Sequence, residues 1–317
     1  MCTSANFITD NGVYCGRNYD YEQSFNESVV IVPRHYKFEY RAVPNNDWHL
    51  AMMGIVTGYV RDYPLFYDAT NERGLTVCGL NFDGNAVYHP LDEHKINIAP
   101  FELIPYLLQN NATVKDARKA LWNVNIFDES YSDDLPNSPL HWMVSDANGD
   151  SIVIESTING LKVYDNPVGV LTNNPPFPYQ LSELNKYRGL SVENPQNTFG
   201  VELDQYSRGM GAYGLCGDYS STSRFVKASF IRANALESDK ILDDVHQFFH
   251  ILGSVEQVNG LTLVDKDKYE YTIYSDCYHN SGLYFKSYYD HNIWRVEFDD
   301  ADYVKGDELE FIMDVME

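Results

Sequence analysis

The sequence has no long hydrophobic run. None of its apolar stretches approaches the roughly 20 residues that a membrane-spanning helix requires. The first residues also lack the basic segment and following apolar segment of a secretory signal peptide. We therefore expect a soluble protein that is neither inserted into a membrane nor secreted.

Cysteine is scarce, and its spacing indicates neither a disulfide framework nor a zinc site. The five cysteines are an odd number, lie far apart and contain no Cys-x-x-Cys pair. They are Cys2, Cys15, Cys78, Cys216 and Cys277. Reduced thiols of this kind are typical of the cytoplasm, which is where we expect the protein.

Positive charge is scarce too. Lys and Arg total 23 against 46 Asp and Glu, which gives a formal net charge of −23. This argues against nucleic acid as a partner, because affinity for phosphates rests on Lys and Arg. It also disfavours an anionic membrane surface. An anionic substrate would have to be met by local arginines.

Several motifs that would point to a reaction are missing or incomplete. No Gly-x-Ser-x-Gly elbow is present, which removes the simplest serine-hydrolase interpretation. Residues 209–214 fit Gly-x-Gly-x-x-Gly, but they neither follow an apolar strand nor open a helix. His246 and His250 have helical spacing, yet Gln247 stands where a metalloprotease has glutamate. We expect neither a metal nor a cofactor.

The apolar content is sufficient for one large domain. The chain has 317 residues, 44% of them hydrophobic, and we treat residues 1–317 as a single domain. Apolar segments bounded by turn residues predict strands at 4–9, 13–18, 29–32, 50–59, 65–69, 75–81, 140–145, 152–155, 161–164, 168–171, 269–276, 283–288 and 293–298. Helical patterns cover 101–109, 113–122, 180–188, 223–235 and 241–252. This order predicts an α+β fold of two antiparallel sheets packed on each other with helices outside.

The second residue combines a thiol with a potential free amine. The small side chain of Cys2 permits removal of Met1, after which one residue would carry both a nucleophile and a base. The reference pKa is about 8.5 for the thiol and about 7.7–8 for the amine, so each is near its useful state at neutral pH. N-terminal amines activate their own side chains in acyl transfer. For this residue alone, a frayed terminus is the alternative.

The first hairpin brings further groups towards Cys2. Residues 10–12 (Asp-Asn-Gly) predict a turn, and the returning strand carries Arg17 and Asp20 back along the first one. A nearby cation lowers the pKa of a thiol, and a carboxylate can orient an amine. The alternative is a surface ion pair, worth about 0–1 kcal/mol.

Three polar residues at the ends of elements add to the candidate site. Asn173 follows a strand and precedes prolines. Its side-chain amide could act as an oxyanion donor, or the residue could simply form part of a turn. Asn81 has the same two interpretations: its backbone N–H could face a site, or the residue could simply begin a loop. Arg224 lies in the first turn of a predicted helix, where the helix dipole disfavours a cation, and this unfavourable placement indicates a function.

Taken in order, these segments resemble the choloylglycine hydrolase family of N-terminal-nucleophile hydrolases, which comprises bile salt hydrolases and penicillin V acylases. The similarity covers nearly the whole chain. Its motifs are Met-Cys-Thr-Ser at 1–4, Gly-Arg-Asn-x-Asp at 16–20, Asn-Glu-x-Gly-Leu at 71–75, Gly-Leu-Asn-Phe at 79–82, Leu-Thr-Asn-x-Pro at 171–175, Gly-Asp-x-x-Ser-x-Ser-Arg-Phe at 217–225 and Phe-Phe-His-Ile-Leu at 248–252.

The resemblance implies roles for these residues. Cys2 becomes nucleophile and base, Arg17 and Asp20 its activating partners, and Arg224 a further polar member of the site. Asn173 becomes the side-chain oxyanion donor and Asn81 the backbone donor. The family's fold is the four-layer αββα sandwich, its members are commonly homotetramers, and residues 191–217 resemble its assembly and substrate region. Loops matching its pocket offer five substrate-binding residues: Tyr19, Val60, Tyr67, Tyr131 and Leu135.

Two departures from the family's pattern stand close to the site. Tyr19 replaces a usual aliphatic residue and could narrow the pocket mouth, and Cys216 replaces a usual proline and leaves an extra thiol. Neither changes the expected reaction, which is hydrolysis of a bile acid conjugated to glycine or taurine. A penicillin V or acyl-homoserine lactone acylase is the alternative. It is disfavoured because penicillin acylases of this family tend to carry Tyr at the position where this chain has Asn81. A non-catalytic sterol-binding or scaffold protein is another.

Overall fold

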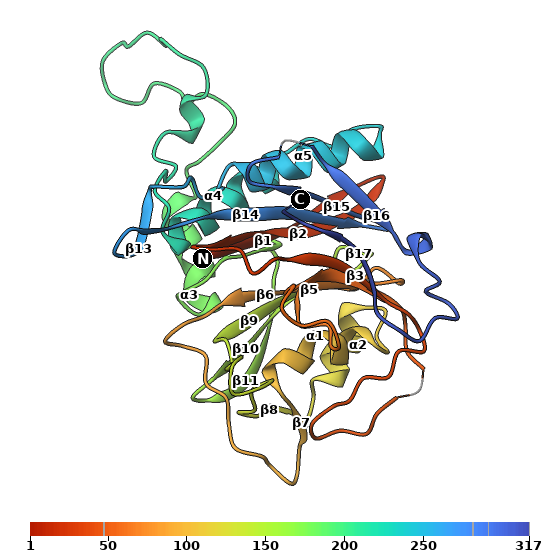
Figure 1. Ribbon diagram of the computed structural model, residues 1–317. Helices are drawn as coiled ribbons and strands as arrows, with labels where there is room; N and C mark the ends of the chain where they lie inside the picture. Colours follow the sequence, from red (N-terminus) through yellow and green to blue (C-terminus); the bar gives the residue numbers. More distant parts are fainter. Residues whose placement is uncertain (47, 281, 291, 317) are drawn as a thin grey trace.

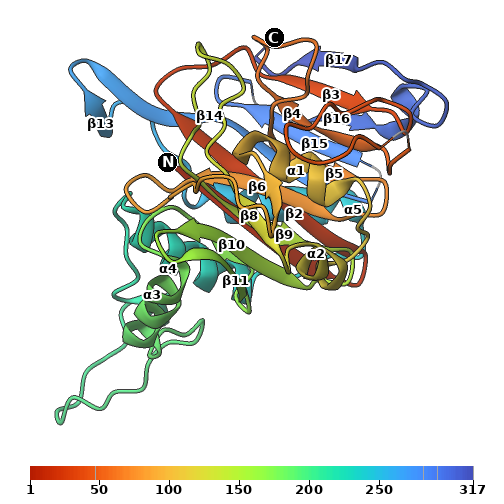
Figure 2. The same ribbon diagram turned by 90° about the horizontal axis from the view of Figure 1, so that it is seen from below.

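The computed structural model describes residues 1–46, 48–280, 282–290 and 292–316. Two antiparallel sheets lie face to face at its centre, and helices cover the outer face of each (Figures 1 and 2). The layers are therefore helix, sheet, sheet and helix, as the sequence predicted. Within the described residues, no helix is both long and apolar enough to cross a membrane.

The first sheet is built around the N-terminal hairpin of β1 (Cys2–Thr9) and β2 (Gly12–Tyr21). Gly12 has φ +127°, a backbone conformation that glycine adopts without strain. The strand order is β12-β1-β2-β14-β15-β16, with β13 paired to β14. The added strands are β12 (Val170–Leu171), β13 (Thr262–Asp265), β14 (Lys268–His279), β15 (Gly282–Ser287) and β16 (Trp294–Glu297).

The second sheet has the order β11-β10-β9-β6-β5-β4-β3-β17. Its strands are β3 (Ser28–Val32), β4 (Met52–Val56), β5 (Phe66–Asn71), β6 (Thr76–Asn81), β9 (Leu140–Ser145), β10 (Ser151–Thr157), β11 (Gly160–Asp165) and β17 (Glu310–Asp314). Leu80 and Met53 of this sheet share one hydrophobic core with Ala5 and Ile273 of the first. That shared core holds the two sheets together.

Helices close both outer faces. α1 (Leu103–Leu108) and α2 (Val114–Ala120) cover the second sheet, and α4 (Ser221–Asn234) and α5 (Ile241–Gly253) cover the first (Figure 1). α3 (Phe177–Glu183) follows β12. Short 3-10 turns are η1 (Pro100–Glu102), η2 (Leu184–Tyr187), η3 (Met210–Ala212) and η4 (Phe298–Asp300). Thr113 caps the start of α2, where its Oγ1 accepts the N–H of Asp116.

The structure corrects the predicted elements in a few places. β4 ends at Val56 rather than at residue 59, and α3 begins at Phe177, three residues before its predicted start. Four strands were missed, namely β13, β17 and the short parallel pair β7 (Ile96–Ile98) and β8 (Val124–Ile126). Residues 191–217, which resemble the family's assembly and substrate region, form a long loop whose one regular element is η3, and this loop projects from the body as an extended arm (Figures 1 and 2).

Candidate active site

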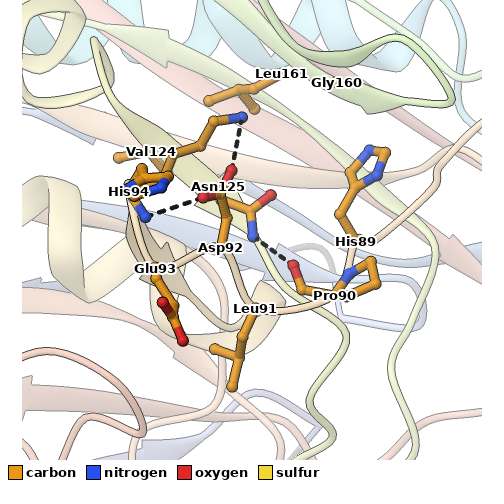
Figure 3. A pocket seen from close by; sticks show the side chains of 11 residues that line it. His89, Pro90, Leu91, Asp92, Glu93, His94, Val124, Asn125, Gly160 and Leu161 are labelled. Atoms are coloured by element: carbon orange, nitrogen blue, oxygen red, sulfur yellow. Dashed lines mark hydrogen bonds and ion pairs between the residues drawn. The ribbon is translucent and has the colours of Figure 1, made fainter.

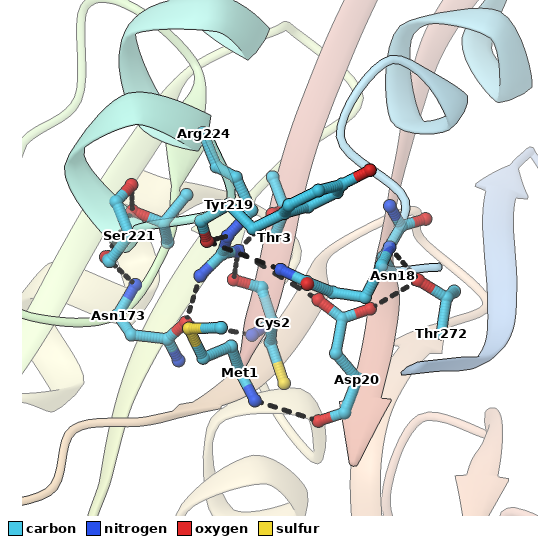
Figure 4. A network of polar contacts seen from close by, with 12 residues as sticks. Met1, Cys2, Thr3, Asn18, Asp20, Asn173, Tyr219, Ser221, Arg224 and Thr272 are labelled. Carbon is cyan, nitrogen blue, oxygen red and sulfur yellow. Dashed lines mark hydrogen bonds and ion pairs between the residues drawn. The ribbon is translucent and has the colours of Figure 1, made fainter. Parts of the chain in front are cut away.

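Cys2 is buried at the start of β1, between the paths of β2 and β12. Its backbone N–H donates a hydrogen bond to Asn173 Oδ1 over 2.9 Å (Figure 4). The pairing of β1 with β12 joins Ser4 to Leu171. Because the strands are antiparallel, Asn173, which is two residues after Leu171, lies beside Cys2, which is two residues before Ser4.

Asn173 uses both ends of its side-chain amide. Its Oδ1 also accepts from Arg224 Nη2 at 2.8 Å, and its Nδ2 donates to the backbone oxygen of Asn81 at 2.7 Å. Asn81 ends β6 of the second sheet, so this bond links the two predicted oxyanion donors. An amide nitrogen carries two hydrogens, and the bond to Asn81 uses one of them. The second hydrogen is the one that can serve a substrate.

Arg224 is buried in the first turn of α4, where it reaches the N-terminal strand. Its Nη1 donates to the backbone oxygen of Cys2 at 2.7 Å and to Thr3 Oγ1 at 2.6 Å, and it lies 4.0 Å from Asp20 Oδ2 (Figure 4). Burial lowers the pKa of Arg224, and the charges of Asp20 and Cys2 raise it. These partners explain why a cation stands at a helix start that would otherwise disfavour it.

Asp20 is a buried carboxylate beside the chain terminus. Thr272 donates to its Oδ1 at 2.6 Å, while its buried Oδ2 has no hydrogen-bond partner among the described residues. The Met1 ammonium donates to the backbone oxygen of Asp20 at 3.0 Å and pairs with Glu270. Burial raises the pKa of Asp20, whereas the terminal ammonium and Arg224 lower it. Burial also lowers the pKa of the Met1 amine.

Arg17 connects the two sheets beneath this network. It opposes Ser4 in the hairpin, and its Nη1 donates across to the backbone oxygens of Tyr67, at 3.2 Å, and Gly79. Asp68 Oδ2 lies 3.9 Å from the same nitrogen. Burial acts to lower the pKa of Arg17, but facing groups, Cys2 foremost, hold it well above its usual value. Arg17 is thus fixed as a cation close to the thiol.

Comparison with known proteins decides the family. Residues 2–313 match the model of the family described as linear amide C-N hydrolases, choloylglycine hydrolase family. The chain belongs to the choloylglycine hydrolase family. The resemblance inferred from its motifs is thereby confirmed, and with it the assignment to C-N hydrolases.

Individual relatives agree with this family assignment. A bile salt hydrolase/transferase from Lactiplantibacillus plantarum is 53% identical over 295 residues, covering 92% of this chain and 90% of its own length. The crystal structure of a mutant conjugated bile acid hydrolase from Clostridium perfringens has a TM-score of 0.91 and 34% identity, over 100% of this chain and 98% of that one. A penicillin V acylase from Agrobacterium tumefaciens shares the fold, with a TM-score of 0.78 at 21% identity over 97% and 90% of the chains.

The five predicted pocket residues divide into two groups. Tyr19 stands opposite Cys2 in the β1–β2 hairpin, and its ring centroid is 4.6 Å from that of Tyr67. Val60, Tyr131 and Leu135 belong to the other hydrophobic cluster, which the second sheet shares with α1 and α2. The structure therefore brings two of the five to the candidate site, and a substrate contact of the other three stays a prediction.

Two cavities in the described part of the chain involve none of the predicted site residues. One, of about 520 Å³, is lined by residues that include His89, Asp92, His94 and Asn125 (Figure 3). The other, of about 300 Å³, opens near Gly12 at the far end of the hairpin. Among the described residues, no group of three or more His, Cys, Asp or Glu side chains is placed to hold a metal ion.

Some site residues were not identified from the sequence. Thr272 reaches Asp20 because β14 pairs with β2 opposite that residue, and Glu270 meets the Met1 amine from the same strand. No local motif marks either position. Ser221, whose Oγ accepts from Asn173 N–H at 2.9 Å, did lie within a recognised motif but was assigned no function.

Proposed function

We propose that this enzyme hydrolyses the amide bond of bile acids conjugated to glycine or taurine. The observation that carries the proposal is the buried network in which Asn173 binds Cys2, Asn81 and Arg224. The names of the relatives from Lactiplantibacillus and Clostridium support bile acids as the substrate class. The presence of Asn rather than Tyr at position 81 favours the same class.

The proposed reaction starts with removal of Met1, which leaves an amine on Cys2. The amine takes the thiol proton, and the thiolate attacks the amide carbonyl carbon, so that a C–S bond forms. The Nδ2 of Asn173 and the backbone N–H of Asn81 stabilise the oxyanion. The ammonium then gives its proton to the leaving nitrogen as the C–N bond breaks. Water, deprotonated by the same amine, hydrolyses the thioester.

Arg17 and Asp20 assist this cycle through charge. Arg17 favours the thiolate because a nearby cation stabilises the ionised form of a thiol. The buried Asp20 Oδ2 lacks a hydrogen-bond partner among the described residues, so an ammonium formed on Cys2 would supply one. Burial lowers the pKa of the Met1 amine, and the same cause would keep a neighbouring amine on Cys2 able to act as a base.

The apolar part of the substrate would lie against Tyr19 and Tyr67. Val60, Tyr131 and Leu135 remain proposed substrate contacts.

A penicillin V or acyl-homoserine lactone acylase is the second candidate, because the same machinery would serve any amide of suitable shape. A non-catalytic sterol-binding protein would retain the pocket without turnover. Incubation with glycocholate, taurocholate and penicillin V, followed by assay of the released amine, separates the three: bile conjugates should be cleaved fastest, and no release from any would contradict the proposal.

Assembly and location belong to the proposal as well. The arm at residues 191–217 exposes large apolar side chains, including Phe199, Tyr206 and Tyr213. Several large apolar side chains exposed in one segment are typical of a contact surface, which supports the homotetramer expected for the family. All five cysteines are free thiols in the structure, which supports a cytoplasmic location.

We expect active protein to begin at Cys2. With Met1 in place the nitrogen of Cys2 is an amide that cannot accept the thiol proton, and the Met1 ammonium is instead held by Asp20 and Glu270. Intact-mass measurement of the active preparation should show loss of Met1. Full activity in protein that retains Met1 would contradict the free-amine mechanism.

Salt should modestly lower the Michaelis constant for glycocholate. The net charge of −23 repels a bile-salt anion at long range, while Arg17 and Arg224 offer only local, buried positive charge. Screening acts mainly on the long-range repulsion, since the Debye length is about 10 Å at 0.1 M salt. Steady-state kinetics from low to moderate ionic strength test this, and a Michaelis constant that rises steeply with salt would be the opposite of what we expect.

A further inference from the structure

His141 and Glu155 form a buried pair that the proposed reaction does not use. Both side chains are fully buried, and His141 Nδ1 lies 3.3 Å from Glu155 Oε1. The register of the second sheet explains their meeting, because His141 on β9 stands directly between Leu80 on β6 and Glu155 on β10. The pair therefore sits one residue behind Asn81, at the same sheet end.

His141 contacts the neighbours of both proposed oxyanion donors. Its Nε2 lies 2.8 Å from the backbone oxygen of Thr172, the residue before Asn173. Its ring stacks on Phe82, the residue after Asn81, with centroids 4.2 Å apart and planes 6° from parallel. One imidazole thus bridges the two chain segments that must present their donors to the same oxygen.

Glu155 fixes the imidazole and the segment beyond it. Its Oε1 also accepts the backbone N–H of Phe177 at 2.9 Å, at the start of α3. A backbone oxygen can only accept, so Nε2 must carry a hydrogen. Nδ1 faces the Glu155 carboxyl group at 3.3 Å, so the carboxyl group fixes the orientation of the ring.

We propose that His141, oriented by Glu155, is a positioning residue that holds Asn173 and Asn81 in register as oxyanion donors. This rests on the proposed function, in which those two residues stabilise the oxyanion. Donors must lie within about 2.7–3.1 Å of the developing oxyanion, and loss of one costs about 100–1,000-fold in rate. A support shared by both donors should therefore act on kcat and leave binding of the apolar acyl group largely intact.

Three substitutions separate the contacts. His141→Phe keeps an aromatic ring against Phe82 but removes both hydrogen bonds. His141→Gln can keep a donor for Thr172 but loses the stacked ring. In Glu155→Gln the amide oxygen would keep the N–H of Phe177 and would therefore face Nδ1 as an acceptor. This favours the tautomer with hydrogen on Nδ1, which would set an Nε2 without hydrogen against the oxygen of Thr172. The matched control is His89→Phe, because His89 Nε2 also lies 2.9 Å from a backbone oxygen, that of Thr157, away from the donors.

The variants are compared for hydrolysis of glycocholate and for alkylation of Cys2 by iodoacetamide. Alkylation displaces iodide from carbon and forms no oxyanion, so it reports on the thiol alone. His141→Phe and Glu155→Gln should lose about 100-fold in kcat, as for one oxyanion donor, with the Michaelis constant and the alkylation rate close to wild type. His141→Gln should show the same pattern with a smaller loss, and His89→Phe should keep wild-type kcat.

Several outcomes would overturn the inference. Wild-type kcat in both His141→Phe and Glu155→Gln is one. A second is a parallel fall of kcat and of the alkylation rate in all three variants. A third is a set of melting temperatures too low for a folded protein. Either result would mean that the pair of His141 and Glu155 serves general packing. The proposed function fails separately, if the wild type does not cleave bile conjugates. In that case the same kcat ratios between variants and wild type are measured with penicillin V as substrate. If the wild type hydrolyses no amide at all, both proposals are wrong.

Discussion

Replacement of Cys2 with serine is expected to lower kcat for glycocholate by at least about 1,000-fold, in line with the effect of removing a nucleophile in other hydrolases. A serine hydroxyl is not ionised near neutral pH, so the hydroxyl is a far poorer nucleophile than the thiolate. The fold should survive, because Ser differs from Cys by one atom and the hydrogen bond to Asn173 uses the backbone nitrogen of residue 2.

Cys216→Ser is the matched control for Cys2→Ser. Cys216 is only half-buried, and its thiol donates to the backbone oxygen of Ser223 rather than into the network around Cys2. Its replacement should leave turnover near wild type. The measurements are steady-state rates and thermal melting of both variants. Wild-type activity in Cys2→Ser would assign the nucleophile to another residue.

The hairpin half of the candidate site was accessible from local sequence. The turn at residues 10–12 sets the register of two adjacent strands, so Cys2 opposes Tyr19 and Ser4 opposes Arg17. Contacts of this kind follow from turn chemistry and the alternation of side chains along a strand. The prediction that Arg17 and Asp20 return towards Cys2 is therefore confirmed as geometry.

The other half could be named from motifs but not placed. Asn173 and Arg224 stand 171 and 222 residues from Cys2 in the chain, and no periodicity in the sequence specifies such contacts. Their meeting depends on β12 pairing with β1 and on α4 packing over the first sheet (Figure 1). Family resemblance supplied what local physical reasoning lacked.

Two kinds of feature escaped the sequence for identifiable reasons. β13 and β17 are short strands with largely exposed or half-buried residues, so they lack the apolar alternation by which strands are recognised. The pair of His141 and Glu155 was hidden for the opposite reason. β9 and β10 are buried on both faces, and a strand without alternation does not reveal which side chains point towards the other sheet.

Replacement of Asn173 with alanine should lower kcat by about 100–1,000-fold, the usual cost of one oxyanion donor. Its Nδ2 is the group that would face the oxyanion, and its Oδ1 accepts from both Cys2 N–H and Arg224. Alanine removes all three functions, so the terminal nitrogen also loses a fixed orientation. The Michaelis constant should change much less, because the proposed contacts of the apolar acyl group are Tyr19 and Tyr67 rather than this amide.

Asn174→Ala provides a control of the same chemistry one residue away. The side chain of Asn174 makes comparable hydrogen bonds, donating to the backbone oxygen of Asp83 at 2.8 Å and accepting from Asn85 at 2.6 Å, but these tie down a loop. Its loss should change kcat by no more than about threefold, which corresponds to about 0.65 kcal/mol in the activation free energy. Steady-state kinetics of the two variants with glycocholate distinguish a specific donor from any asparagine in this turn. Equal losses at 173 and 174 would mean that the turn as a whole, rather than the amide of Asn173, supports catalysis.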